Sequence, residues 1–318
     1  MVWMILVLTC IASWSTCDLC YKKGSDCEDK LSHLRFLVWL GIVMGISSFL
    51  LFPWSESGVP FGALVLKYAD YMPFALAYVL ALMCGIIGAR HLDISVASPL
   101  ENIDGAVAAA ILLVYFAATG AVSNLAEQFT WLDPFGVLFI VVGTILLGIQ
   151  EQRRSKAEEA IEGNHKLGAA AFLFPFIYTL FDAASMVFEG AVFQADNGEF
   201  IGEIDFLILE GAAFFTVGVG AWIWLLFAEK TVYCPFRKGE LVKCGAAITE
   251  NLGNVFFAFA IAKNPVLTPP VTTTYFIFTI FGAKIFLKEK MSRRQYFCLF
   301  ILSVGIILLG ISEILKNM

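Results

Sequence analysis

Apolar and polar positions alternate along this chain in long blocks rather than residue by residue. Ten apolar blocks are close to the roughly 20 residues that a helix rising about 1.5 Å per residue needs to cross about 30 Å of hydrocarbon. Short polar connections separate them. The pattern predicts an all-α membrane protein with ten transmembrane helices, approximately at residues 1–21, 34–52, 71–89, 94–118, 135–150, 167–192, 206–228, 241–262, 266–287 and 296–314.

The chain also contains an internal repeat. Residues 125–151 align without a gap on residues 287–313 at a constant offset of 162, and 11 of these 27 positions are identical. Each half then holds five predicted helices, and because five is odd, the second half is inverted relative to the first, as in many secondary transporters. We expect a first five-helix repeat at 1–151, a charged linker at 152–166 and a second five-helix repeat at 167–318.

Composition supports the membrane interpretation. Hydrophobic residues make up 59% of the chain and charged residues only 15%, well outside the averages for soluble domains. The first apolar block has no basic residue before it and no cleavage site of small residues, so we expect a helix there and not a signal peptide.

Lysine and arginine are segregated between alternate connections. They cluster after the odd-numbered predicted helices and are nearly absent after the even-numbered ones, with Lys67 and Lys263 as the main exceptions. The positive-inside rule then places the odd connections in the cytoplasm and both termini outside. The net charge of −6 says little about partners. No N-glycosylation acceptor and no retrieval signal is found, which favours the plasma (inner) membrane of a bacterium.

Acidic residues inside the predicted helices carry the functional interpretation. An ionisable group is costly at membrane depth and usually faces a cavity or a partner. No Lys, Arg or His lies in the middle of a predicted helix, so a proton or a bound cation must balance these acids. The acids are Asp18, Glu101, Asp104, Asp182, Glu189, Glu210 and Glu250.

Their depths are expected to differ. Asp18 is close to Lys22 in the sequence, and Glu189 and Glu210 lie near helix ends, so an interfacial position is expected for these three. Asp104 lies about 17 Å along its helix from Asp93, near the midplane. Asp182 and Glu250 are also expected to be deep.

Two predicted helices begin with an interruption. One contains Ser98-Pro99-Leu100-Glu101-Asn102-Ile103-Asp104-Gly105, and the other contains Thr268-Pro269-Pro270-Val271-Thr272-Thr273-Thr274-Tyr275. If Pro99 corresponds to Pro270, interrupted helices occupy related positions in the two halves, which is a pointer to a transporter site. Two ordinary proline kinks are the alternative.

Glu250 and Asn254 lie four residues apart and share one helix face. Together they can coordinate an ammonium group or hydroxyl groups. An interhelical hydrogen bond worth about 1 kcal/mol is the alternative.

Several other classes of function are disfavoured. There is no HExxH motif, no Ser/His pairing and no P-loop, so neither an intramembrane enzyme nor ATP-driven transport by this chain alone is expected. Cys17 and Cys20 have C-x-x-C spacing but no His nearby, which favours packing over a metal site. Gly41 and Gly45 form a GxxxG motif, expected to pack helices within the bundle.

Two short motifs, one in each half of the chain, carry a family resemblance. Leu125-Ala-Glu127-Gln-Phe-Thr130 and Leu287-Lys-Glu289-Lys-Met-Ser292 each lead into a glycine-containing last helix. With ten apolar helices in two inverted fives, the chain resembles the drug/metabolite transporter superfamily, specifically its EamA-like ten-helix branch. The resemblance implies a basket of ten helices, a central cavity between helices three, four, eight and nine, and alternating access by rocking of the halves.

The resemblance also implies transport of amino acids, sugars, nucleotide sugars or other small metabolites, often coupled to protons or by exchange. Several relatives have termini in the cytoplasm, opposite to the charge pattern here. The resemblance and the acids together predict a secondary active transporter of a small polar metabolite, with an amino acid, amine or other cationic compound favoured as the substrate. A sugar or nucleotide-sugar carrier and a non-transporting accessory protein are the alternatives.

The substrate is expected to bind at an acidic floor with amide and hydroxyl contacts around it. The expected partners are the substrate, the lipid bilayer and protons, with no cofactor and no nucleic acid, in a monomer or homodimer. The candidate substrate-binding residues are Glu101, Asn102, Asp104, Asp182, Glu250, Asn254, Thr272, Thr273 and Tyr275.

Overall fold

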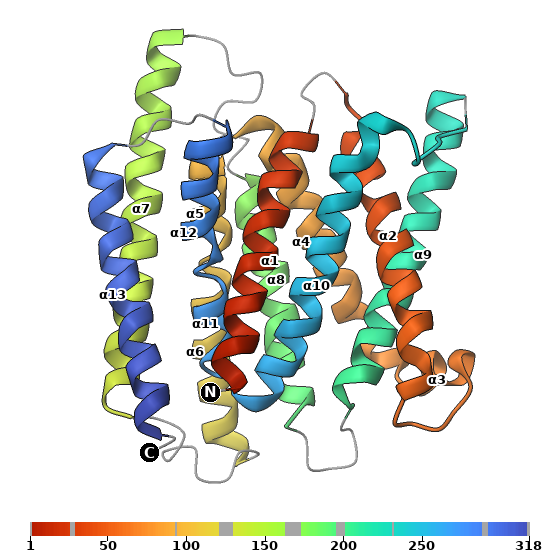
Figure 1. The fold of residues 1–318 in the computed structure, drawn as a ribbon, viewed down its shortest axis with the longest axis horizontal. Helices are drawn as coiled ribbons and strands as arrows, with labels where there is room; N and C mark the ends of the chain where they lie inside the picture. Colours follow the sequence, from red (N-terminus) through yellow and green to blue (C-terminus); the bar gives the residue numbers. More distant parts are fainter. Residues whose placement is uncertain are drawn as a thin grey trace.

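The structure is a computed structural model that describes residues 2–25, 29–92, 94–120, 130–162, 173–194, 201–230, 232–287 and 292–316. Within these ranges the chain is helical and contains no β-strand, which confirms the predicted all-α class. The helices stand side by side as an upright bundle (Figure 1). They are α1 (Val2–Gly24), α2 (Ser32–Leu51), α3 (Phe61–Lys67), α4 (Met72–His91), α5 (Ile94–Glu101), α6 (Asp104–Thr119), α7 (Leu132–Glu162), α8 (Leu173–Val192), α9 (Glu203–Glu229), α10 (Leu241–Lys263), α11 (Thr268–Thr272), α12 (Tyr275–Gly282) and α13 (Arg293–Lys316).

Several of these helices have the length and apolarity that a bilayer requires. Within the described ranges, five stretches qualify, and two shorter helices, at Asp104–Thr119 and Leu132–Gly143, are also apolar. Large hydrophobic side chains such as Phe227, Phe286 and Leu66 are exposed on the outside of the bundle. These features indicate a multi-pass membrane protein. The five stretches are Val2–Gly24, Ser32–Trp54, Ala69–His91, Glu203–Glu229 and Leu241–Lys263.

The main helix pairs join the first half of the chain to the second. α1 packs along α10, α2 along α9, α4 along α8 and α7 along α13. Gly41 of α2 faces Gly218 of α9 so closely that a Cβ on either glycine would lie 2.8 Å from the other's Cα. The GxxxG motif thus serves packing within the bundle, as the sequence predicted.

The fourth and ninth predicted helices are each broken in two. α5 and α6 are separated at Asn102 and Ile103, and not at Pro99, which lies within α5. The Asn102 side chain donates a 2.7 Å hydrogen bond to the Ser98 carbonyl, and such local bonds compete with the helix ladder. The interruption predicted at Pro99 is therefore displaced by three residues.

The break between α11 and α12 lies at Thr273 and Thr274, after the two prolines. Here too a side chain bonds the backbone locally, since Thr274 Oγ1 donates to the Val271 carbonyl at 2.6 Å. Both breaks therefore leave short polar turns inside the bundle.

Two predicted features are changed or not described. α7 continues through residue Glu162, so the first part of the expected linker at 152–166 is helical. Residues 163–172 lie outside the described ranges. So do 121–129 and 288–291, which contain most of the two repeat motifs.

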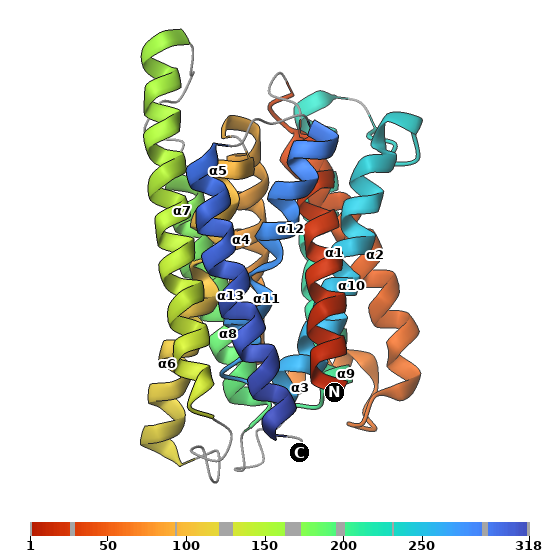
Figure 2. The same ribbon diagram turned by 60° about the vertical axis from the view of Figure 1, so that its left-hand side comes forward.

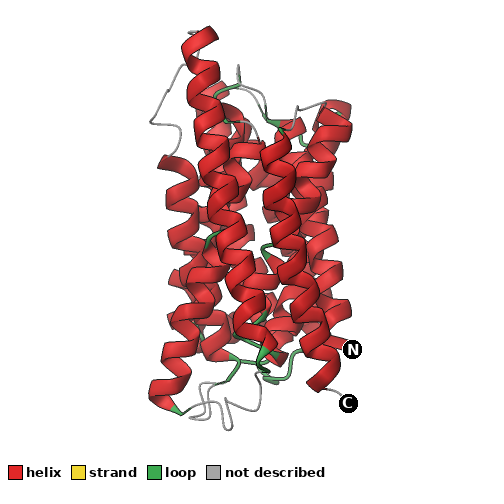
Figure 3. Cartoon of the chain, turned by 90° about the vertical axis from the view of Figure 1, so that its left-hand side faces the viewer, coloured by secondary structure: helices red, strands yellow, loops and turns green. Residues whose placement is uncertain are grey.

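The two termini lie at the same end of the bundle (Figures 1 and 2), and the view in Figure 3 agrees. At the opposite end, ion pairs connect α2 to α9 and to Glu240, the residue before α10. Arg35 contacts Glu229 at 2.7 Å and Asp29 at 3.2 Å, and Lys243 contacts Glu240 at 2.9 Å. Burial and a 2.8 Å hydrogen bond to Glu240 raise the pKa of Tyr233, in the connection between α9 and α10. The bundle is thus held together at the end that carries most basic connections.

Candidate functional site

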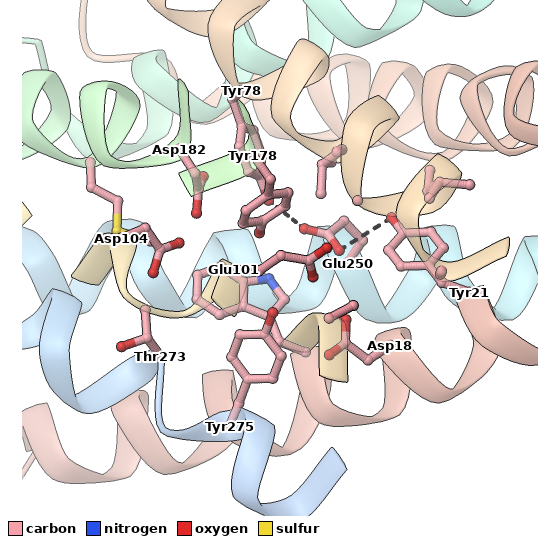
Figure 4. Close-up of a pocket in the computed structure, with 17 residues that line it drawn as sticks. Asp18, Tyr21, Tyr78, Glu101, Asp104, Tyr178, Asp182, Glu250, Thr273 and Tyr275 are labelled. Atoms are coloured by element: carbon pink, nitrogen blue, oxygen red, sulfur yellow. Dashed lines mark hydrogen bonds between the residues drawn. The ribbon is translucent and has the colours of Figure 1, made fainter. Parts of the chain in front are cut away.

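A cavity lies in the centre of the bundle, between helices of both halves (Figure 4). α1, α4, α5, α6, α8, α10 and α12 line it, so α1 and α8 join the four helices that the resemblance implied. It has room for a few water molecules, which makes this conformation too narrow for a metabolite. Five of its described lining residues are carboxylic acids, and none is Lys, Arg or His; the acids are Asp18, Glu101, Asp104, Asp182 and Glu250.

Glu250 on α10 is the best-organised of these acids. The Tyr78 hydroxyl donates to its Oε1, while the Tyr21 hydroxyl at 3.3 Å and the Cys17 thiol at 3.1 Å reach its Oε2. The side chain is 3% exposed. Hydrogen bonds donated to a carboxyl group favour its ionised form. Glu250 is therefore arranged as a fixed negative charge.

Asp104 and Asp182 form a second arrangement on the other side of the cavity. Their carboxyl groups are neighbours that interact electrostatically, and Tyr178 also lies beside Asp182. Two adjacent carboxyl groups without a cation are more stable when one of them carries a proton. The backbone N–H of Gly105 donates to Asp104 Oδ1 at 2.6 Å and fixes its orientation. The pair is arranged to hold one proton beside the cavity.

Glu101 is the last residue of α5, and it points into the cavity from the helix break. Its side chain is 8% exposed, and its Oε1 has no hydrogen-bond partner among the residues that the structure describes. Gly85 of α4 lies beside this oxygen, since a Cβ on Gly85 would be in van der Waals contact with it at 3.6 Å. A buried carboxyl oxygen without a partner is costly. A ligand donor in the cavity would satisfy it.

The two broken helices meet at this site. Gly105, at the start of α6, lies against the break between α11 and α12. A Cβ on Gly105 would come within 2.5 Å of both the Pro269 carbonyl and Thr273 Oγ1. Only a glycine permits this approach without displacing the backbone. The contact brings the polar turn of α5–α6 and that of α11–α12 to one place.

The structure brings most of the predicted site residues together. Glu101, Asp104, Asp182, Glu250, Thr273 and Tyr275 line the central cavity. Asn254 lies next to it and accepts hydrogen bonds from Tyr78 at 3.0 Å and Trp14 at 3.2 Å.

Two predicted residues lie elsewhere. Thr272 is fully buried and donates to the carbonyl oxygens of Thr268 and Pro269, so its hydroxyl is used within its own helix. Asn102 donates to Ser98 and faces a separate small cavity that it shares with Thr273 and α7.

The interfacial positions expected for three acids are not observed. Asp18 turns into the cavity and accepts hydrogen bonds from Ser98 at 3.1 Å and Thr279 at 3.4 Å. Lys22 donates instead to the carbonyls of Ala89 and Leu92, which are free because α4 ends there.

Glu189 and Glu210 are 6% and 5% exposed and line an adjoining cavity. Neighbouring helices bury them, although both lie close to helix ends. The seven-residue spacing of Asp182 and Glu189 on one face of α8 was the sequence signal that could have found them.

The tyrosines of the cavity were not singled out from the sequence, apart from Tyr275. Tyr21, Tyr78 and Tyr178 come from α1, α4 and α8 and line the cavity, and the hydroxyl groups of Tyr21 and Tyr78 donate to Glu250. Tyrosine is common in apolar helices, so its residue type alone carried no signal.

No protein-family model matches the chain. No curated protein matches it either. Solved structures do resemble it, and one crystal structure, described only as "Crystal structure of protein", has a TM-score of 0.58 and 11% identity. The likeness covers 96% of both chains. At this level of identity the likeness shows only that the two chains share a fold.

Proposed function

We propose that this chain is a secondary active transporter of a small polar metabolite, with amine-bearing or cationic compounds favoured as substrates. One observation carries the proposal: the central cavity presents five carboxyl groups and, among its described residues, no basic side chain. Unbalanced negative charge in a buried site costs several kcal/mol, so a bound cation or proton is required there. A cationic substrate satisfies this requirement directly.

The pairing of helices supports a ten-helix inverted repeat. α5–α6 and α11–α12 each count as one broken helix, which gives five helices per half. The first helix of each half then packs on the third of the other, as α1 on α10 and α8 on α4. The second helices of the two halves, α2 and α9, pack together. So do the fifth helices, α7 and α13, and the broken fourth helices, α5–α6 and α11–α12. This pattern is unchanged when the halves are exchanged, as expected of an inverted repeat in an EamA-like member of the drug/metabolite transporter superfamily.

The roles of the acids follow from their partners. Glu250 holds the positive charge of the substrate, because its three donors maintain the carboxylate in one orientation. Asp104 and Asp182 hold the proton that is exchanged, because two adjacent carboxyl groups without a cation favour one proton between them. Rocking of the halves about the contact at Gly105 exposes the cavity to each side in turn. The basic connections face the cytoplasm and the termini face outward, in the plasma membrane of a bacterium.

A sugar carrier is the second candidate, and the four tyrosines of the cavity favour it. Their hydroxyl groups and aromatic faces suit a neutral polyol. The lack of a basic residue among the described lining disfavours an anionic nucleotide sugar.

A thermal-shift screen of the purified protein against amines, amino acids, sugars and nucleotide sugars, at about pH 5.5 and pH 7.5, tests the choice, since stabilisation follows mass action. We expect an amine or amino acid to raise the melting temperature of the wild type and not of Glu250→Gln. Glu203→Gln, at the start of α9 and away from the cavity, is the matched control. Hits among sugars alone that are indifferent to pH would establish the second candidate, and no hit in any class would contradict both.

A further inference from the structure

A second, smaller cavity adjoins the central one. Trp14, Tyr78, Asp182 and Met186 line both, so the two are separated only by shared side chains. It lies toward the end of the bundle that carries the termini, where α8 ends and α9 begins (Figure 1). The space holds about one water molecule. Its other lining residues are Glu189, Phe206, Glu210, Asn254 and Phe257.

Two carboxyl groups enter this chamber from neighbouring helices. Glu189 of α8 is 6% exposed; its Oε1 accepts a long bond of 3.5 Å from Ser185, and its Oε2 has no partner among the residues that the structure describes. Glu210 of α9 is 5% exposed and accepts a 3.3 Å bond from Asn254. An ionised carboxyl with so few donors is strongly disfavoured among aromatic walls.

The groups that face this pair bring no positive charge. α1 contributes Cys10 and Trp14, the segment leading into α4 contributes Tyr71, and α4 itself contributes Tyr78. α8 and α10 contribute Asp182, Ser185, Glu250 and Asn254. All of these are neutral or acidic, so no side chain in the described part of the chamber can neutralise two carboxylates.

A metal ion does not fit this chamber as well as a proton does. Hard cations take about six oxygen ligands. The described residues contain no cluster of three acidic, His or Cys side chains arranged for a metal. The amide oxygen of Asn254 is already engaged by Trp14 and Tyr78. A proton needs no such shell and no additional space.

We propose that Glu189 and Glu210 bind a proton at a second site, connected through Asp182 to the central cavity. Asp182, Ser185 and Glu189 lie on one face of α8, and seven residues separate the two acids, about 10 Å of rise. Transfer along this face breaks one carboxyl O–H bond and forms another. The role of the site in coupling rests on the proposed transport function; the binding of the proton does not.

Aromatic side chains close the chamber on the side of the termini. The Phe206 ring lies 4.9 Å from that of Tyr71 and 5.0 Å from that of Phe193, measured between centroids. This packing separates the acids from the end of the bundle in the present conformation. Protons therefore enter from that side only when the aromatic cluster opens.

Infrared spectroscopy of the purified full-length protein tests the proposal, because protonated and ionised carboxyl groups absorb at different frequencies. We expect the wild type to keep a protonated-carboxyl band above about pH 5, where exposed acids are ionised, and to lose it as the pH is raised further. In a Glu189→Gln/Glu210→Gln double variant this band should be smaller, whereas Glu203→Gln should match the wild type. Each Gln keeps the size of the Glu it replaces. A double variant with the wild-type titration would overturn the proposal, provided that it keeps the wild-type helical circular dichroism.

Labelling with dicyclohexylcarbodiimide, which reacts with protonated carboxyl groups in apolar surroundings, locates the proton by mass spectrometry. The adduct is expected on Glu189 or Glu210 above about pH 5, where exposed acids are ionised, and it should decline as the pH is raised further. It should be unchanged when sodium replaces choline in the buffer. If sodium prevents labelling of these acids, the site binds a metal cation and not a proton, which would overturn the proposal. If the double variant unfolds, labelling of the wild type decides alone, and absence of both adducts then refutes the proposal. None of these results depends on a substrate. A failed ligand screen therefore does not contradict the proton site, and a failed proton test does not contradict the proposed transport function.

Discussion

Individual side chains divide the acids of this protein into two kinds. Glu250 has three donors, whereas Glu101 and Glu189 each keep one oxygen without a partner among the described residues. Tyr78 links the two cavities, because its hydroxyl contacts both Glu250 and Asn254. With one hydrogen to donate, it can satisfy only one of them at a time. Its hydroxyl therefore bonds either the Glu250 carboxyl group or the Asn254 amide at any one time.

Replacing Tyr78 with Phe tests this at the residue scale. The change leaves the size of the side chain nearly constant but removes a donor from a buried carboxylate, so we expect a loss of about 1–3 kcal/mol in the free energy of unfolding. Denaturant titration in detergent, followed by circular dichroism, measures it. Tyr115→Phe, on the exposed face of α6, should be close to neutral. Equal effects of the two substitutions would show that the Tyr78 hydroxyl is not engaged as described.

At the scale of elements, the long helices follow from the sequence and their interruptions do not. Apolar length decides whether a helix forms at membrane depth, because backbone groups there must bond within the segment. The breaks depend on local bonds by Asn102 and Thr274, which compete with the helix only in this packing. The placement of Glu189 near a helix end was right, but burial by α9 and α10 was not visible from one helix alone.

The contact between the two broken helices gives the prediction at this scale. In Gly105→Ala the new Cβ would meet the Pro269 carbonyl and Thr273 at 2.5 Å, so the two turns must separate. Overpacking of this kind costs about 1–3 kcal/mol, measured by the same denaturant titration. Gly220→Ala, in α9 with nothing within 4 Å of the added Cβ, should be neutral or slightly stabilising. If Gly105→Ala behaves like Gly220→Ala, the turns do not meet as described.

For the whole molecule, the symmetrical pairing of helices places the acids between the first and second halves of the chain. Ion pairs of Arg35 connect α2 to α9 at the basic end, and aromatic packing around Phe206 closes the other end. In the proposed alternating access, the narrow central cavity fits a conformation closed on the side of the termini. The repeat was visible in the sequence from residues 125–151 and 287–313, whereas the second chamber depends on three helices that the sequence does not place together.

Proton movement in proteoliposomes tests the central claim most directly. A pH-sensitive dye trapped inside reports protons exchanged when amino acids or permanently charged amines are added outside, with protein-free liposomes as the blank. We expect at least one such compound to change the internal pH with the wild type and with Glu203→Gln, and not with Glu250→Gln. An equal response from Glu250→Gln, or no response to any compound from well-folded wild type, would contradict an acidic cavity that carries cations.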